Sequence, residues 1–158
     1  MNSDFKDLLR LFAVHEVSYL IVGGYAVAHH AQPRFTKDLD LWIGPTPENA
    51  PKVAAALREF GIPLIEVVES DFAQEGLQFA VGMPPTQLDF LTTIPGLVFN
   101  ECWTDRVSAK VDNIPVFYLS LSALIIAKQT ASRAQDLADL EDLRRVDHGT
   151  GSNSSPHP

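Results

Sequence analysis

Apolar residues follow helical and then strand spacing from the start of the chain, and this pattern predicts the first three elements. Residues 3–16 place their apolar side chains on one helical face, which predicts a helix. Tyr19–Val22 is a short apolar run typical of a buried strand, and Tyr25–Ala31 has the composition of a helix. Because Gly23 and Gly24 separate these two elements, the predicted order is strand, glycine turn, helix.

The rest of the chain predicts three further helices and several strands. The helices are expected at Pro47–Phe60, from Ser120 to about Ala131, and at Arg133–Val146. Thr46 before the first of these and Gly61 after it are typical helix-boundary residues. The strands are expected at Leu39–Ile43, Leu64–Val68, Leu77–Val81, Gln87–Leu91, Val107–Val111 and Pro115–Tyr118. Asp112 and Asn113, between the last two strands, are typical of a hairpin turn.

The composition favours one folded domain followed by a polar tail. A chain of 158 residues that is 46% hydrophobic buries a core without disulfides or structural zinc. We therefore expect a single domain over residues 1–146. Residues 147–158 are mostly Gly, Ser, Asn, Pro and His, so apolar burial cannot offset their ordering entropy, and we expect a disordered C-terminal tail there.

Charge and cysteine content indicate which binding partners and which cellular compartment to expect. The net charge of -8 disfavours long-range attraction to nucleic acid or to an anionic membrane. The longest apolar runs are far shorter than the roughly 20 residues that span a bilayer, so we expect no membrane association. Cys102 has no partner for an internal disulfide, and Met1–Arg10 carries charged residues where a secretory leader is apolar. A cytoplasmic protein is the expectation.

Asp38 and Asp40 are candidates for a metal site because of their spacing on a predicted strand. Residues two apart on a strand point to the same face, so both carboxylates share one side while Leu39 and Leu41 face the core. Carboxylates this close raise each other's pKa unless a cation lies between them, and oxygen ligands suit magnesium. The alternative is a solvated sheet face without a metal.

Two further features add to this pair. Gly23 and Gly24 follow a strand and open a helix, an arrangement that lets a phosphate approach the backbone amides, although the same glycines also fit a purely structural tight turn. Asp89 lies between Leu88 and Phe90 on a predicted strand and points away from the core face, as an ordinary exposed residue would. Taken together, the features predict that three strands meet at one acidic site.

These motifs in this order resemble the nucleotidyltransferase superfamily, with its glycine turn, Asp-x-Asp strand and later third carboxylate. The residues that carry the resemblance are Gly23-Gly24, the run Arg34-Phe35-Thr36-Lys37-Asp38-Leu39-Asp40-Leu41, and Asp89. More narrowly, Lys128 followed by the run Ala131–Leu140 resembles the abortive-infection (AbiEii-type) toxin branch and related uncharacterised nucleotidyltransferase-like proteins. The resemblance covers residues 17–145 and implies a minimal α+β (α/β) nucleotidyltransferase fold, with a mixed central sheet flanked by helices.

The resemblance also implies an activity and roles for individual residues. Asp38, Asp40 and Asp89 would bind magnesium, with manganese as an alternative, and would transfer a nucleoside monophosphate from a nucleoside triphosphate to a hydroxyl. Lys128 would contact phosphate, and Asp136 would orient Lys128, Arg133 or the acceptor. Gly23, Gly24 and Thr36 complete the expected nucleotide-binding set, with Gly24 standing where many members have serine.

The sequence leaves the acceptor and two other readings open. The acceptor is a transfer RNA end, a protein hydroxyl or a small molecule, and an antitoxin-like protein is a candidate partner. The main alternative to the enzyme is a non-catalytic nucleotide- or partner-binding regulatory module of the same fold. A plain interaction domain with a solvated acidic face is the third hypothesis.

Overall fold

The structure is a computed structural model that describes residues 1–83 and 86–153. Its strands are β1 (Tyr19–Val22), β2 (Asp38–Ile43), β3 (Gln78–Met83), β4 (Thr86–Leu91), β5 (Val107–Val111) and β6 (Ile114–Tyr118). They form one mixed sheet in the order β3-β4-β2-β1-β6-β5. The β1–β6 and β2–β4 pairs are parallel, and the β1–β2, β3–β4 and β5–β6 pairs are antiparallel. The predicted mixed sheet is confirmed.

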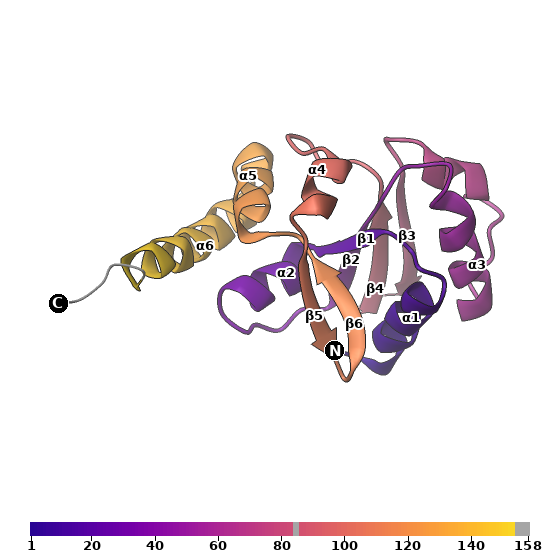
Figure 1. The fold of residues 1–158 in the computed structure, drawn as a ribbon, viewed down its shortest axis with the longest axis horizontal. Helices are drawn as coiled ribbons and strands as arrows, with labels where there is room; N and C mark the ends of the chain where they lie inside the picture. The colour runs from indigo at the N-terminus through magenta and orange to yellow at the C-terminus, as the bar shows by residue number, and fades with distance from the viewer. Residues whose placement is uncertain (84–85, 154–158) are drawn as a thin grey trace.

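Helices cover the sheet in two groups. They are α1 (Ser3–Val14), α2 (Gly23–His30), α3 (Ala50–Phe60), α4 (Phe99–Thr104), α5 (Leu121–Ala131) and α6 (Ala134–Asn153), with a 3-10 helix, η1 (Glu69–Ala73). α1 packs against α3 and β6, whereas α2 packs on β1 and β2 and contacts α5 and α6. In Figure 1 the α1–α3 pair lies to one side of the strands and the α2–α5–α6 group to the other.

The alternation of buried residues along β4 decides which way Asp89 faces. Leu88 and Phe90 are buried, and the ring of Phe90 lies 6.5 Å from the ring of Phe12 on α1. Since successive strand residues point to opposite faces, Asp89 is turned away from the apolar layer that contains Phe12. The burial of Leu88 and Phe90 in the core therefore sets the direction in which the Asp89 side chain points.

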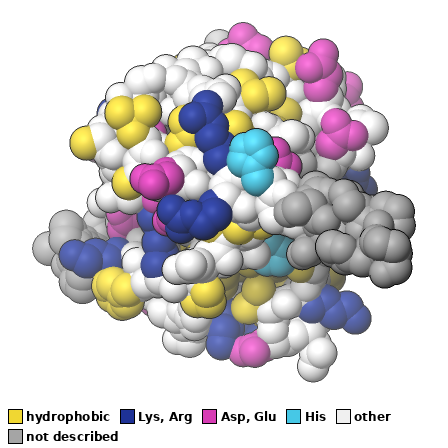
Figure 2. All heavy atoms as spheres, turned by 90° about the vertical axis from the view of Figure 1, so that its left-hand side faces the viewer, with side chains coloured by type: hydrophobic (Ala, Val, Ile, Leu, Met, Phe, Trp, Pro, Cys, Tyr) yellow, Lys and Arg dark blue, Asp and Glu magenta, His cyan; other side chains and the backbone are white. Residues whose placement is uncertain are grey.

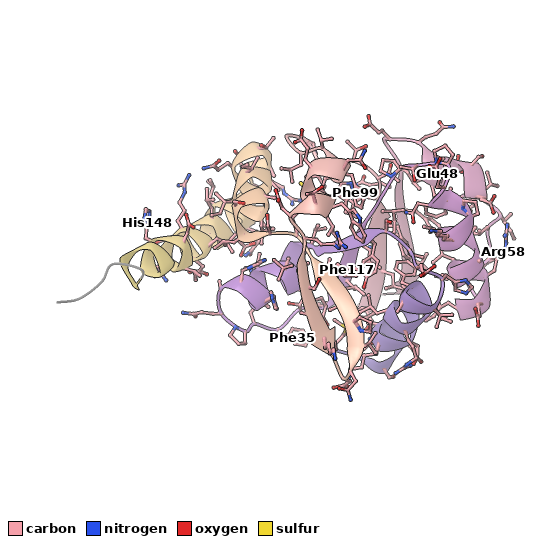
Figure 3. The ribbon with its side chains drawn as sticks, in the orientation of Figure 1. Phe35, Glu48, Arg58, Phe99, Phe117 and His148 are labelled. Atoms are coloured by element: carbon pink, nitrogen blue, oxygen red, sulfur yellow. The ribbon has the colours of Figure 1, made fainter. Side chains whose placement is uncertain are left out.

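A short helix that the sequence pattern did not predict covers the end of β2. Phe99, at the start of α4, packs edge-on against Trp42 with ring centroids 5.2 Å apart (Figure 3). The approach is close enough that a side chain at Gly44 would lie 2.7 Å from the Phe99 ring. α4 has only six residues, too few for helical periodicity to be distinguished from a loop.

The predicted turn and cap residues are confirmed at two places. Asp112 and Asn113 have φ of 47° and 66°, the left-handed values that a two-residue hairpin requires, and they join β5 to β6 with Val111 opposite Ile114. Gly61 ends α3 with φ of 105°, a conformation that glycine adopts without the strain of a side chain.

Two predicted elements differ in the structure. Leu64–Val68 forms no strand: Ile65 is 79% exposed, and the Val68 amide donates to Asp71 at 2.8 Å, which starts η1 instead. The prediction was wrong because alternation alone does not provide a neighbouring strand to pair with. α3 begins at Ala50 rather than at Pro47, although the Thr46 hydroxyl still accepts from the Asn49 amide at 3.1 Å in the turn before it.

The C-terminal helix is longer than the sequence pattern predicts. α6 continues past Val146 to Asn153, and residues 154–158 of the predicted tail lie outside the described residues. Among the helices that the structure describes, none is both long and apolar enough to cross a membrane.

Candidate active site

Parallel pairing of β2 with β4 brings two of the predicted carboxylates side by side. Asp40 lies directly opposite Asp89 in the register, and Asp38 lies opposite Gln87. Gln87 donates from Nε2 to Asp89 Oδ1 at 2.7 Å, which orients that carboxylate. The sequence analysis did not single out Gln87, although its spacing of two residues from Asp89 on the same strand face was a usable signal.

Asp40 is electrostatically strained by its surroundings. Burial, a side-chain hydrogen bond with Asp89 and the charges of Asp89 and Asp38 raise the pKa of Asp40 to about 7, against a smaller lowering by Lys128. A carboxyl group with an ordinary pKa near 4 therefore keeps its proton close to neutral pH when no cation is present. Binding of a divalent cation would remove this strain.

The strain on Asp40 predicts a pH-dependent stability in the metal-free protein. Because the folded-state pKa exceeds the unfolded value, the folded protein binds more protons between pH 4 and 7, and its free energy of unfolding falls as the pH rises through that range. Without metal at pH 8, Asp40→Asn is expected to unfold with a free energy about 1–3 kcal/mol higher than the wild type, a difference that disappears near pH 4. Chemical denaturation with a chelator present measures this.

Asp112 provides the control for that measurement. It is exposed and its pKa is lowered by a hydrogen bond from Lys6 and by the Lys6 charge, so Asp112→Asn removes a favourable interaction and should give no stability gain at pH 8. Equal gains in both variants would mean that a general reduction of negative charge, rather than strain at Asp40, is responsible.

The glycine turn lies directly against the acidic pair. Gly23 has φ of 65°, and a Cβ there would lie 2.0 Å from Oδ2 of Asp40. A Cβ at Gly24 would lie 2.7 Å from Cγ2 of Thr36 and 3.3 Å from Nη2 of Arg34. Both glycines are therefore needed for close approach, and the N-terminus of α2 begins beside Asp40 with its backbone exposed to the site.

A helical hairpin places positive charge across from the carboxylates. Lys128, near the end of α5, donates from Nζ to Asp136 Oδ1 at 3.2 Å and to Asp139 Oδ2 at 3.0 Å, and Arg133 Nε donates to Asp136 Oδ2 at 2.7 Å. Both aspartates are almost completely buried on α6. Burial would raise the pKa of Asp136, but the hydrogen bonds from Arg133 and Lys128 outweigh it and lower that pKa.

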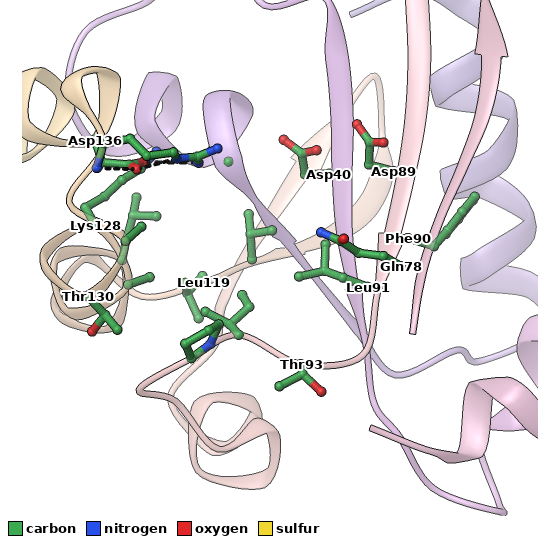
Figure 4. A pocket seen from close by; sticks show the side chains of 18 of the residues that line it. Asp40, Gln78, Asp89, Phe90, Leu91, Thr93, Leu119, Lys128, Thr130 and Asp136 are labelled. Atoms are coloured by element: carbon green, nitrogen blue, oxygen red, sulfur yellow. Dashed lines mark hydrogen bonds and ion pairs between the residues drawn. The ribbon is translucent and has the colours of Figure 1, made fainter. Parts of the chain in front are cut away.

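The carboxylates, the glycine turn and the hairpin border one open pocket of about 710 Å³ (Figure 4). In Figure 4 the carboxylates of Asp40 and Asp89 lie toward one end of the pocket, and Thr93 and Thr130 lie toward the other. Leu119 lies near that second end in Figure 4, and the lining contains further apolar residues, among them Leu91, Ile94, Pro95, Ala127 and Ala131. The pocket thus has a charged end and an apolar end.

The structure brings together some of the residues predicted for the site and leaves others apart. Those that line the pocket are Gly23, Asp40, Asp89, Lys128 and Asp136. Asp38 does not line it, although its charge acts on Asp40, and Thr36 lines a neighbouring cavity of about 300 Å³ with Arg34. Within residues 1–83 and 86–153, no three Asp, Glu, His or Cys side chains form a ready metal-ligand group.

The donors present still fit a hard divalent cation. Asp40 and Asp89 offer adjacent carboxylate oxygens, and burial together with the charges of Asp89 and Asp38 raises the pKa of Asp40 by more than Lys128 lowers it. Magnesium usually takes one or two protein carboxylates and completes its shell with water and substrate phosphate oxygens. A pair of carboxylates that lines the same pocket as Gly23 meets that requirement.

Comparison with known proteins supports the fold and little beyond it. No protein-family model matches the chain, and no curated protein matches it significantly in sequence. Among solved structures, the chain is similar to the lincosamide antibiotic adenylyltransferase LnuA in its lincomycin-bound form, with a TM-score of 0.56 and 17% identity over 92% of this chain and 98% of that one. The narrower resemblance to the abortive-infection toxin branch stays a prediction. The six-stranded mixed sheet flanked by helices is similar to the fold of that adenylyltransferase, and the mixed α+β fold that the sequence predicted is confirmed.

Proposed function

We propose that the protein transfers a nucleoside monophosphate from a nucleoside triphosphate to an acceptor hydroxyl, with magnesium bound at Asp40 and Asp89. The observation that carries this proposal is the pairing of these two aspartates in register, opposite Lys128, in one pocket with the Gly23 turn. The adenylyltransferase activity of a structural neighbour that shares the fold is consistent with it.

Each side chain has a definite part in the proposed reaction. Magnesium, held by Asp40 and Asp89 with Asp38 nearby, would neutralise phosphate charge and lower the barrier to in-line displacement. The acceptor oxygen attacks the α-phosphorus, the bond to the β-phosphate oxygen breaks, and pyrophosphate leaves. Asp89, held in place by Gln87, accepts the proton that the hydroxyl loses.

The cations of the hairpin and the glycine turn hold the triphosphate. Lys128 is 12% exposed and presents its ammonium group to the pocket, and Arg133, 80% exposed, reaches the same edge. A compact ammonium and a planar guanidinium with several N–H donors both suit phosphate oxygens. At Gly23 the missing side chain lets Asp40 lie against the first turn of α2, and Gly23 itself lines the pocket in which the triphosphate would bind.

The lining of the pocket favours a small molecule over a nucleic acid as acceptor. The apolar residues of the lining, among them Leu91, Ile94 and Pro95, offer no charge to the phosphates of a nucleic acid. The face shown in Figure 2 carries Lys and Arg mixed with Asp, Glu and hydrophobic side chains rather than a continuous basic surface. An RNA acceptor requires such a surface for its phosphates, whereas a small hydroxyl compound with an apolar body fits the pocket.

Titration calorimetry tests the nucleotide site. Each of the four nucleoside triphosphates is titrated into the protein with and without magnesium, and we expect magnesium-dependent binding of at least one. The double variant Asp38→Asn, Asp40→Asn is expected to lose that binding because the cation loses its ligands. The matched control is Asp4→Asn, Asp7→Asn, which removes two exposed carboxylates from α1 and should bind as the wild type does.

The outcomes of the titration separate the hypotheses. Binding lost only in the Asp38, Asp40 variant supports the site and identifies the nucleotide. Binding without magnesium dependence would contradict the metal-based mechanism while keeping a nucleotide-binding module. Absence of binding to the wild type would refute the enzyme and favour a partner-binding module of the same fold.

A further inference from the structure

Asp139 is a buried carboxylate that joins three separate parts of the chain. It lies on α6, is 1% exposed, and does not line the pocket. Its Oδ2 accepts from Lys128 Nζ at 3.0 Å, and its Oδ1 accepts from Gln135 Nε2 at 2.9 Å and from Nη1 of Arg34. Three donors from α5, α6 and the loop before β2 therefore meet at one side chain.

Arg34 belongs to a segment that has few other anchors. Residues 32–37 contain no helix or strand and lead directly into Asp38 and Asp40 on β2. Within residues 1–83 and 86–153, the other hydrogen bond from this segment to the rest of the chain is that of the Tyr25 hydroxyl, which donates to the carbonyl oxygen of Thr36 at a long 3.3 Å. The Arg34 guanidinium also lies beside Gly24, where a Cβ would be 3.3 Å from Nη2. The position of this segment thus depends on its contact with Asp139.

Lys128 depends on the same carboxylate for its position. With Asp139 present, the ammonium group is fixed between two buried aspartates, and with Asp136 alone it would keep one partner that it shares with Arg133. An ammonium group on a flexible four-carbon chain has little preferred direction without such partners. The hydrogen bonds from Lys128, Gln135 and Arg34 also explain why burial does not keep Asp139 protonated.

We propose that Asp139 is a positioning residue that holds the loop of Arg34 and the ammonium of Lys128 in one arrangement for a nucleoside triphosphate. This role rests on the proposed nucleotide site, since Lys128 contacts phosphate only if a triphosphate binds there. Asp139 acts through its two cationic partners and is not itself in contact with the ligand. The loop on one side of the glycine turn and the lysine on the other are thereby set as a unit.

The test uses Asp139→Asn, which keeps the shape of the side chain and removes its charge. We expect the folded variant to bind magnesium and the nucleoside triphosphate about tenfold more weakly than the wild type by calorimetry. Hydrogen exchange in the free protein should become faster at the amides of residues 32–37 and stay unchanged in α3, which is remote from the contact. Arg145→Gln is the matched control, because Arg145 pairs on the exposed side of α6 with Glu141 and Asp142.

A double-mutant cycle separates positioning from a general structural role. Arg34→Gln should weaken nucleotide binding, and adding it to Asp139→Asn should cause little further loss, because both changes break the same contact. A residue that only stabilises the fold would lower the melting temperature and leave the nucleotide affinity of the folded protein unchanged. If Asp139→Asn does not fold, Arg34→Gln alone carries the test through the same two measurements.

These measurements distinguish failure of the positioning role of Asp139 from failure of the proposed function. If the wild type does not bind any triphosphate, the proposed function is wrong and so is this role in it. If the wild type binds and Asp139→Asn keeps the nucleotide affinity within about twofold, the positioning role is overturned and the nucleotide site stands. If Asp139→Asn does not fold, the same criterion applies to Arg34→Gln. Weaker binding together with faster exchange at residues 32–37 supports the inference.

Discussion

Replacing Asp89 with asparagine is expected to reduce nucleotide transfer by about a thousandfold, while nucleotide affinity falls by about tenfold at most. Asparagine has the size of aspartate but does not accept a proton from the attacking hydroxyl. Gln87 Nε2, which now donates to Asp89 Oδ1 at 2.7 Å, can still donate to the amide oxygen of asparagine, so the side chain keeps its orientation. Asp40 and Lys128 remain to hold the cation and the phosphates, which is why binding should suffer less than turnover.

Pyrophosphate release and calorimetry, measured on the same preparation, give the two quantities for this variant. Asp7→Asn is the control, because Asp7 pairs with Arg10 on the exposed side of α1. Gln87→Ala should show an intermediate loss of rate, about tenfold, as expected for a residue that only orients the base. An Asp89→Asn variant that turns over at the wild-type rate would exclude Asp89 as the proton acceptor.

Gly23→Ala is expected to abolish nucleotide binding and to lower the free energy of unfolding by about 2–4 kcal/mol. Two causes add up in this variant. The residue has φ of 65°, where alanine is strained, and its new Cβ would lie 2.0 Å from Asp40 Oδ2. Asp40 must therefore move, and with it one of the two carboxylates that would hold the cation.

Gly61→Ala is the matched control for that substitution. Gly61 also has a positive φ, 105°, but a Cβ there has nothing within 4 Å, so only backbone strain remains. We expect a loss of about 1 kcal/mol in unfolding free energy and no change in nucleotide affinity. Denaturant unfolding and calorimetry measure both effects, and equal behaviour of the two alanine variants would mean that the close approach to Asp40 is unimportant.

The sequence predicted the parts of the site that depend on local geometry. The shared face of Asp38 and Asp40 follows from the period of a strand, and the hairpin at Asp112 and Asn113 follows from residues that tolerate positive φ. Gly23 was recognised from its place between a strand and a helix. Each of these features depends on neighbours within a few residues in the chain.

The sequence did not show the relations that depend on which elements meet. Asp89 lies opposite Asp40 only because β2 lies between β1 and β4, and no local pattern encodes that order. On α6, Asp136 and Asp139 are both 1% exposed, a burial that the spacing of residues along the helix does not predict. The cost of burying them is offset by Arg133 and Gln135 nearby in the chain and by Lys128 and Arg34, which other elements provide.

The two ends of the pocket are formed by different parts of the chain. Strands and the glycine turn form the end with Asp40 and Asp89, whereas the residues following β4 and one side of α5 form the apolar end. Substitutions at Ile94, Pro95 or Ala127 therefore alter the shape offered to an acceptor without disturbing the register of the sheet. Under the proposed function, homologous proteins would accept different hydroxyl compounds through substitutions in the segment after β4, while the residues proposed to bind the cation and the phosphates stay the same.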